Sequence, residues 1–294
     1  MQISEEIRSA WQIITRNKVR SFLTMLGITI GVTAVIIVMS VGAGAQSLIL
    51  NQVTSMGSNL VGVLPGQSEE KGPPASVFGI VITTLKNEDG KKVMARGYEH
   101  LVAYSGYVRG VDTVTWGENK TDTQFVGVGA ELPDVEDTKV ESGRFFSDDE
   151  DRSLARVAVL GSEVADELFE DQNPLGKRVK IKKTNFTVIG VMRKRGVSGF
   201  QNQDNQIFVP ITTAQKLLLG IDHVNFMRFK VDSGENVDDS MEFIREILRE
   251  QHDISKPVDD DFTVQSMAQG LEVLSTITNA LRIFLVAVAG ISLA

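Results

Sequence analysis

Two acidic clusters are the first candidates for chemistry, because closely spaced carboxylates can bind divalent cations. Residues 148–151 read Asp-Asp-Glu-Asp, and residues 259–261 read Asp-Asp-Asp. A calcium loop spaces its oxygen ligands at alternate positions around a glycine turn, and neither cluster has that spacing. We therefore predict no metal at either cluster, and expect solvated charges at a turn or at a helix start, where the helix dipole favours negative charge.

The candidate catalytic residues are isolated from one another. His100, His223 and His252 are far apart and stand beside no nucleophile. Ser162 follows a glycine, but the sequence LGSEV lacks the second glycine of a G-x-S-x-G elbow. The chain has no cysteine for disulfides or thiolate metal sites, and no G-x-x-x-x-G-K-[ST] phosphate loop. We predict that the chain is not an enzyme and has no catalytic residue, cofactor or metal of its own.

The element that organises the chain is an apolar segment near its start. Residues 21–43 contain no charged side chain, and the next charge after Arg20 is Glu69. A helix needs about 20 apolar residues to cross a hydrocarbon layer ~30 Å thick. The segment exceeds the apolar core of a signal peptide, although the small residues 42–45 resemble a cleavage site. We predict a transmembrane helix over residues 21–43.

A helical stripe precedes this segment. Ile7, Trp11 and Ile14 recur at helical spacing within residues 1–20, where basic residues gather next to the predicted span. Such an amphipathic helix is typical of the membrane interface, and positive charge beside a span favours the cytoplasmic side. We predict a cytoplasmic coupling helix over residues 1–20. The alternative is that these residues only mark the cytoplasmic end of the span and bind no partner.

A pair of glycines lies within the predicted span. Gly27 and Gly31 form a G-x-x-x-G pair, and small residues at that spacing let a second helix approach closely. The pattern is also common by chance in membrane helices. We treat the two glycines as candidates for helix packing.

Most of the chain has the composition of a water-soluble protein. Its hydrophobic fraction is 42%, and its net charge of −8 argues against a nucleic-acid partner. Short strands alternate with helices over residues 44–278, which predicts an α+β extracytoplasmic domain with one or two lobes. We predict strands at 59–64, 101–108, 111–116, 124–128, 155–160, 178–181, 186–192, 206–210, 224–231 and 262–264, helices at 83–94, 162–169, 212–219 and 237–250, and a loop from Leu132.

The last residues read as the start of a second span. Residues 280–294 are apolar apart from Arg282. A helix of this length covers only about 22 Å, short of the ~30 Å required. We predict that residues 279–294 begin a second transmembrane helix, and that the sequence is a fragment of a longer membrane protein.

Motifs in a fixed order carry a resemblance to a known family. They are residues 17–32 (NKVRSFLTMLGITIGV), 58–61 (SNLV), 143–146 (GRFF), 157–161 (VAVLG), 173–177 (NPLGK), 208–210 (FVP) and 285–293. Together they resemble the MacB-type permeases, the type VII ABC transporter permeases that include lipoprotein-releasing and FtsX-like proteins. The resemblance covers essentially the whole chain, although the remaining spans of that family and a fused ATPase are missing.

The resemblance implies a non-catalytic permease subunit in the bacterial inner membrane, with a cytoplasmic N-terminus. A separate cytoplasmic ABC ATPase would bind ATP and drive movements of the extracytoplasmic domain, for export of a drug, peptide or lipoprotein-like substrate. The implied partners are a second copy or a paralogous permease, and a periplasmic adaptor. Two alternatives remain open: a membrane-tethered sensor or binding domain, and an FtsX-like regulator of cell-wall hydrolases.

Overall fold

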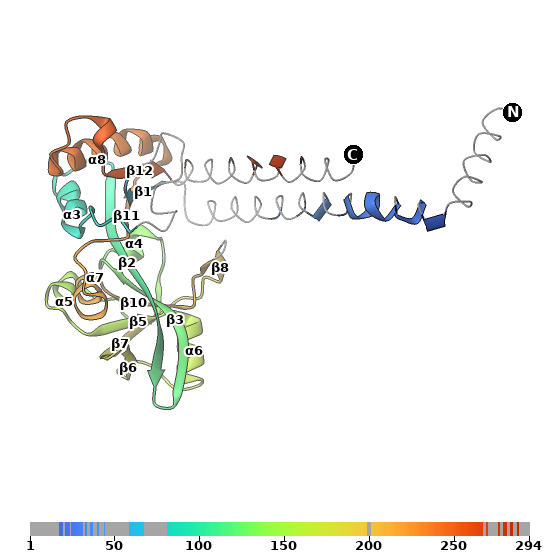
Figure 1. Ribbon diagram of the computed structural model, residues 1–294. Coiled ribbons are helices and arrows are strands. Elements are labelled where there is room, and N and C mark those ends of the chain that lie inside the picture. Colours follow the sequence, from blue (N-terminus) through green and yellow to red (C-terminus); the bar gives the residue numbers. More distant parts are fainter. Residues whose placement is uncertain are drawn as a thin grey trace. The chain divides into compact units, whose positions relative to one another are not determined.

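The computed structural model (Figure 1) describes residues 59–67, 81–198 and 201–266 continuously, with scattered positions between 18 and 44 and between 269 and 287. The chain divides into two compact units, residues 1–49 with 274–294, and residues 50–273. In the first unit, every described position is helical. No helix within the described residues has both the length and the apolar character needed to cross a membrane. Much of each predicted span lies outside the described residues.

The second unit is built on one ten-stranded sheet, in the order β12-β1-β11-β2-β3-β10-β5-β7-β4, with β6 paired to both β2 and β7. A separate hairpin joins β8 (Val197–Ser198) and β9 (Gln201–Asn202). The strands of the large sheet are β1 (Leu60–Pro65), β2 (Leu101–Trp116), β3 (Asn119–Val128), β4 (Val140–Gly143), β5 (Val157–Leu160), β6 (Arg178–Ile181), β7 (Thr184–Met192), β10 (Gln206–Pro210), β11 (Phe226–Val231) and β12 (Phe262–Ser266).

Six of these strands form a closed ring. The pairing runs from β2 through β3, β10, β5, β7 and β6 and back to β2. Every strand of the ring contributes to one buried apolar cluster, with Val114, Phe125, Ile207, Leu160, Val188 and Ile181 among its members. The strands β11, β1 and β12 continue the sheet from the first half of β2. Figure 1 shows β2 running through both parts, so this one strand joins them.

Helices cover the sheet on two faces. On the β12-β1-β11 part, alternate residues such as Val61, Phe229 and Val264 share a buried cluster with side chains of α3 (Asn87–Ala95) and α8 (Val237–Gln251). The opposite face carries Leu60, which packs with Val135 of the short α4 (Leu132–Val135). The remaining helical segments are α5 (Asp148–Arg152), α6 (Ser162–Phe169), α7 (Ile211–Thr213), the π-helix η2 (Ala214–Leu219), and the 3-10 turns η3 (Gly234–Asn236) and η4 (Pro257–Asp259).

Several predicted elements differ in the structure. The two strands expected at 101–108 and 111–116 are one strand, because Gly110 continues the ladder opposite Phe125 instead of making a turn. The expected loop from Leu132 contains α4, and the helix expected from residue 83 begins at Asn87. The possible two lobes of the prediction belong to a single compact unit, because one path of paired strands runs through both parts of the sheet. The predicted α+β class is confirmed.

Candidate functional site

The edge of the sheet at which the chain enters and leaves the second unit is the first candidate site. The strand β1 follows the N-terminal segment, and β12 precedes the C-terminal one. They pair antiparallel, with Val61 opposite Ser266 and Pro65 opposite Phe262, and β1 also pairs with β11. Two segments from opposite ends of the chain are therefore attached to neighbouring strands of one ladder.

Side chains reinforce this edge. The Arg245 guanidinium of α8 donates a hydrogen bond to the Val264 carbonyl of β12 at 3.1 Å. Arg249 donates two hydrogen bonds of 2.8 Å to the Asp260 carboxylate just before β12. Thr263 donates to the Gly66 carbonyl at 2.7 Å. The edge strand is thus attached to α8 as well as to β1.

The sequence-predicted packing glycines lie in the first unit. Both are helical; Gly27 is exposed, and a Cβ added to it would meet nothing within 4 Å, whereas Gly31 is buried. Ile7, Trp11 and Ile14, the residues of the predicted coupling helix, lie outside the described residues. Their packing and coupling roles remain predictions.

The two acidic clusters have structural partners. Residues 148–151 begin α5, as expected, and Ser147 and Glu150 form its capping box. Asp151, however, is buried and accepts hydrogen bonds from the backbone N and the Oγ1 of Thr212, at 2.8 and 3.1 Å. Asp260 binds Arg249, so the prediction of solvated charges is wrong for these two carboxylates. In the described ranges, no group of three His, Asp or Glu side chains is arranged to hold a metal ion.

His252 joins two carboxylates behind the edge of the sheet. Its side chain is only 11% exposed, with Nδ1 2.7 Å from Asp261 Oδ1 and Nε2 3.4 Å from Asp89 Oδ2. The hydrogen bond to Asp89 and the charge of Asp261 outweigh desolvation and raise the pKa of the imidazole. His252 directly follows α8, and its two partners lie in α3 and just before β12. It therefore has a structural role, because it links these three segments.

A buried cluster of charges lies on the face covered by α4. Glu136, which directly follows α4, accepts hydrogen bonds from Arg228 at 2.6 Å, from Arg195 at 2.9 Å and from the Tyr107 hydroxyl at 2.9 Å. Its side chain is 9% exposed. Burial alone would raise the pKa of the Glu136 carboxyl, but Arg228 and Arg195 lower it below its usual range. The carboxylate therefore ties β2, β11 and the segment after β7 together.

Arg109 completes this arrangement from β2. Its guanidinium lies 4.6 Å over the Phe226 ring, and Phe226 stacks on Tyr107 with centroids 4.4 Å apart. Burial and the nearby charge of Arg228 lower the pKa of the Arg109 guanidinium. Its Nε atom is buried and has no hydrogen-bond partner within the described residues. We call Arg109, Arg195, Arg228 and Glu136, with the two stacked rings, the arginine cluster.

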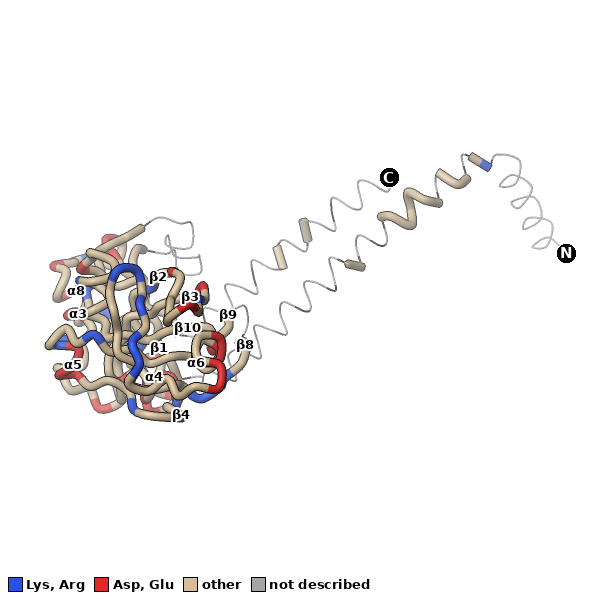
Figure 2. Tube along the Cα trace, turned by 90° about the horizontal axis from the view of Figure 1, so that it is seen from below, with Lys and Arg blue, Asp and Glu red and all other residues tan. Residues whose placement is uncertain are grey.

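Sequence reasoning missed the arginine cluster. Its members come from β2, the end of α4, the segment after β7, and β11, and no motif or spacing connects them. Figure 2 shows acidic and basic residues interspersed over the unit. A group with three guanidinium charges and one carboxylate is a local exception to that balance.

Comparisons with known proteins agree with the fold. The family model of the MacB-like periplasmic core domain matches residues 21–247. The macrolide export ATP-binding/permease protein MacB of Chlorobium luteolum is 36% identical over 96% of this chain and 42% of its own length. The protein of the same name from Bdellovibrio bacteriovorus is 32% identical over 99% of this chain and 45% of its own length. The chain thus spans less than half the length of these relatives.

Two solved structures share the fold at low sequence identity. The periplasmic region of MacB from Actinobacillus actinomycetemcomitans has a TM-score of 0.62 and 21% identity, covering 79% of this chain and 98% of that one. The extracellular domain of the ABC-type transporter YknZ from Gram-positive bacteria has a TM-score of 0.55 and 19% identity, covering 71% of this chain and all of that one.

Proposed function

Because the chain belongs to the family of the MacB-like periplasmic core domain, we propose that it acts as a non-catalytic permease subunit of an ABC transporter. In this proposal, residues 21–43 cross the bacterial inner membrane from a cytoplasmic N-terminus, and the unit built on the ten-stranded sheet is extracytoplasmic. A separate cytoplasmic subunit hydrolyses ATP. The names of the relatives, which combine ATP binding with export, support a transport role.

The pairing of β1 with β12 is the observation that carries the proposal. A displacement of the N-terminal segment acts on β1, and the ladder passes it to β12 and to β11. From β11 it reaches β2, which belongs to the closed ring as well. Backbone hydrogen bonds along every step make the sheet stiff to such a pull, so the domain is suited to relaying movement.

The remaining parts of the proposal concern partners and cargo. The relatives are named for macrolide export, and we extend the substrate class to drugs, peptides or lipoprotein-like molecules. A second copy or a paralogous permease would complete the membrane part. A periplasmic adaptor would contact the extracytoplasmic unit.

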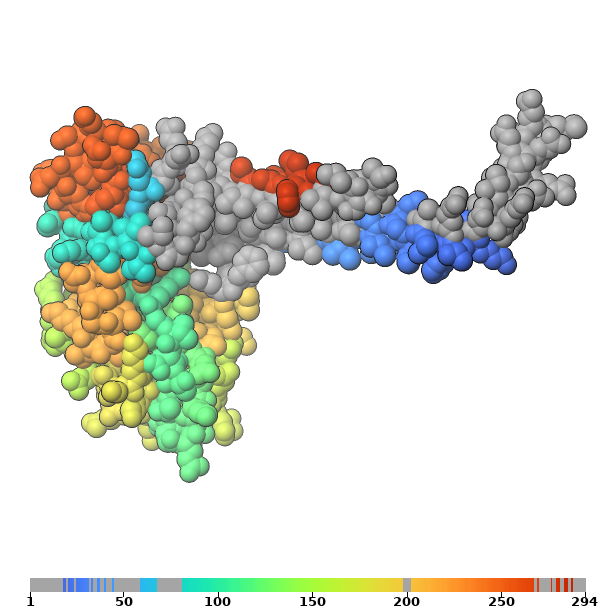
Figure 3. Space-filling model, in the orientation of Figure 1, coloured from blue at the N-terminus to red at the C-terminus, as the bar shows by residue number. Residues whose placement is uncertain are grey.

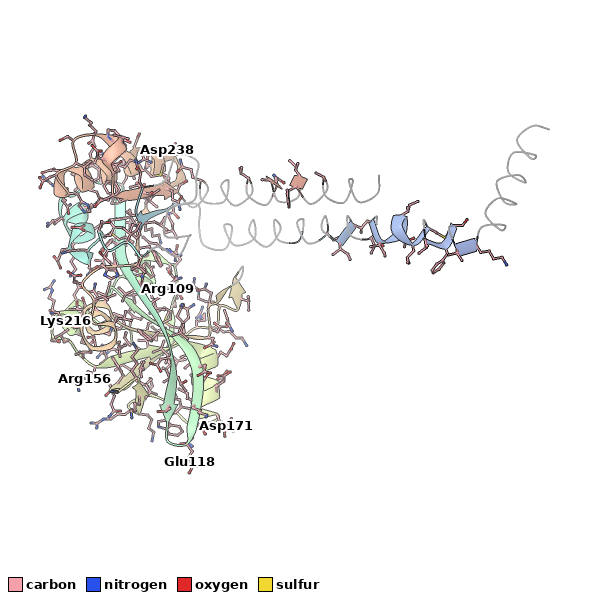
Figure 4. All side chains as sticks on the ribbon, viewed as in Figure 1. Arg109, Glu118, Arg156, Asp171, Lys216 and Asp238 are labelled. Carbon is pink, nitrogen blue, oxygen red and sulfur yellow. The ribbon has the colours of Figure 1, made fainter. Side chains whose placement is uncertain are left out.

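A flexible insertion tests the relay. Four Gly/Ser residues inserted between Ser58 and Asn59 would decouple the N-terminal segment from β1 without altering any strand. The matched control carries the same insertion after Gly117, in the β2–β3 turn, which forms the green tip in Figure 3 and is marked by Glu118 in Figure 4. Exposed turns tolerate insertions well.

Both variants would be reconstituted in vesicles with the ATPase subunit. We expect the insertion before β1 to abolish ATP-driven transport while ATP hydrolysis persists, and the control to retain both. Unchanged transport in the first variant would contradict the relay, whereas absence of ATP-driven transport by the unmodified chain would favour the tethered sensor. ATP hydrolysis by the purified chain alone would contradict the assignment as a non-catalytic subunit.

A further inference from the structure

Arg109 is the least satisfied charge of the arginine cluster. The side chain is half-buried, and its Nε is fully buried. Among the described residues, the Arg109 guanidinium makes no hydrogen bond, and it stacks on Phe226 at 4.6 Å from the ring centroid. A buried donor without an acceptor costs about 1–3 kcal/mol, and more when it is charged. Such a group is stabilised when an acceptor binds.

The neighbouring charges do not supply that acceptor. The Glu136 carboxylate is occupied by Arg228, Arg195 and the Tyr107 hydroxyl. Asp137 is the next carboxylate along the chain, and it pairs with Lys230. The cluster therefore keeps an excess of positive charge in a chain whose net charge is −8.

We propose that the arginine cluster is a carboxylate-binding site in which Arg109 holds the ligand. Guanidinium groups bind planar carboxylates through two parallel hydrogen bonds. The stacking on Phe226 fixes the plane of the Arg109 guanidinium, and Arg228 adds a second positive charge 5.3 Å from the centroid of the same ring. Arg109 on β2 and Arg228 on β11 lie on strands that the proposed relay also uses, but ligand binding at the cluster does not require that relay.

The cluster itself favours a singly charged carboxylate. It already binds one such group, because Glu136 fits between two guanidinium groups and a tyrosine hydroxyl.

An exposed apolar side chain lies next to Arg109. Val111 follows Arg109 by two positions in the regular ladder of β2, which places it on the same face of the strand, and it is 73% exposed. A carboxylate next to an apolar group fits these surroundings, and it would come either from a free organic acid or from a glutamate or aspartate of a protein segment.

The experiment uses the full chain labelled with ¹⁵N-arginine. The Nε–Hε resonance of Arg109 would be assigned by its loss in Arg109→Lys, and followed during titration with sodium acetate and with the blocked tripeptide Leu-Glu-Leu. We expect both probes to shift this resonance in a saturable way. Tighter binding of the tripeptide would identify a protein segment as the source, and equal affinity would identify a free acid.

Variants distinguish a binding role from a packing role. In Arg109→Gln, binding followed through the remaining arginine resonances should weaken at least about tenfold, since a charge-assisted hydrogen bond is worth that factor or more. Arg109→Lys keeps the charge but not the fork, so we expect an intermediate affinity and an intact fold. The matched control is Arg156→Gln, which removes the same charge from an exposed arginine elsewhere on the unit (Figure 4) and should leave binding unchanged.

Two results would overturn the proposal. One is the absence of any saturable, Arg109-dependent shift with either carboxylate probe while the variants remain folded. The other is tighter binding of inorganic phosphate than of both carboxylates at the same ionic strength, which would make the assigned ligand class wrong.

Discussion

Replacing Glu136 by glutamine tests how much the buried charges stabilise the second unit. The substitution keeps the shape of the side chain but removes the negative charge between Arg228 and Arg195. One amide group would also present hydrogen-bond donors to guanidinium donors. Removing one partner of a buried ion pair costs about 3–5 kcal/mol, because the remaining charges stay buried and uncompensated.

The expected effect is large enough to separate from that of a surface pair. At about 2–4 °C per kcal/mol for a unit of this size, Glu136→Gln should lower the melting temperature by roughly 6–20 °C. The matched control is Asp137→Asn, which removes the neighbouring negative charge from a side chain that is 68% exposed and pairs with Lys230. An exposed pair contributes about 0–1 kcal/mol.

The assay is thermal and urea unfolding of the full chain, followed by circular dichroism. Because the folded-state pKa of Glu136 is lowered, its contribution is present above the unfolded pKa and is lost as pH falls through the folded one. The wild type should therefore lose this part of its stability in acid, whereas Glu136→Gln should lack it at every pH. A loss below 1 kcal/mol, or one equal to that of Asp137→Asn, would refute the reasoning.

Two other substitutions address the sheet and its edge. The raised pKa of His252 means that its ion pairs with Asp89 and Asp261 stabilise the fold fully below the unfolded pKa, and that this contribution is lost as pH rises through the folded pKa. Urea unfolding should therefore show that His252→Gln reduces the free energy of unfolding by about 1–3 kcal/mol near pH 6, and by less near pH 8.5. An equal loss at both pH values would show that the positive charge of the imidazole does not contribute to stability. Gly110→Ala should destabilise the unit by about 1–3 kcal/mol, because the added Cβ would lie 2.2 Å from the Phe125 ring. The matched control Gly62→Ala should be nearly neutral, because the atom nearest to its Cβ would be 3.8 Å away. Similar melting temperatures for the two variants would contradict the close packing of Phe125 on β2.

Local periodicity was enough to predict many of the elements. The alternation Arg178-Val179-Lys180-Ile181 predicted β6, and its valine and isoleucine are buried while its basic residues are exposed. The stripe with Ile244, Ile247 and Leu248 predicted α8, and these three residues are buried. Such patterns succeed because side chains repeat every two residues in a strand and every 3.6 in a helix.

The partners of those elements were decided by tertiary structure alone. Nothing in the local sequence shows that β1 pairs with β12, or that β6 closes the ring by pairing with β2 as well as β7. The continuity of β2 through Gly110 depends on Phe125 of the neighbouring strand. A backbone ladder has the same donors and acceptors at every residue, so the pairing follows from how the whole core packs.

The same limit applies to the candidate sites. The motif series identified the family, because many short matches in one order are specific even when each is weak. The arginine cluster gave no such signal: Glu136 follows a short helix that reads as a loop, and its three donors come from distant parts of the chain. Charge in a sequence normally means solvent exposure. Only the fold brings these side chains together, leaves the Arg109 Nε without an acceptor among the described residues, and makes the group a candidate for binding.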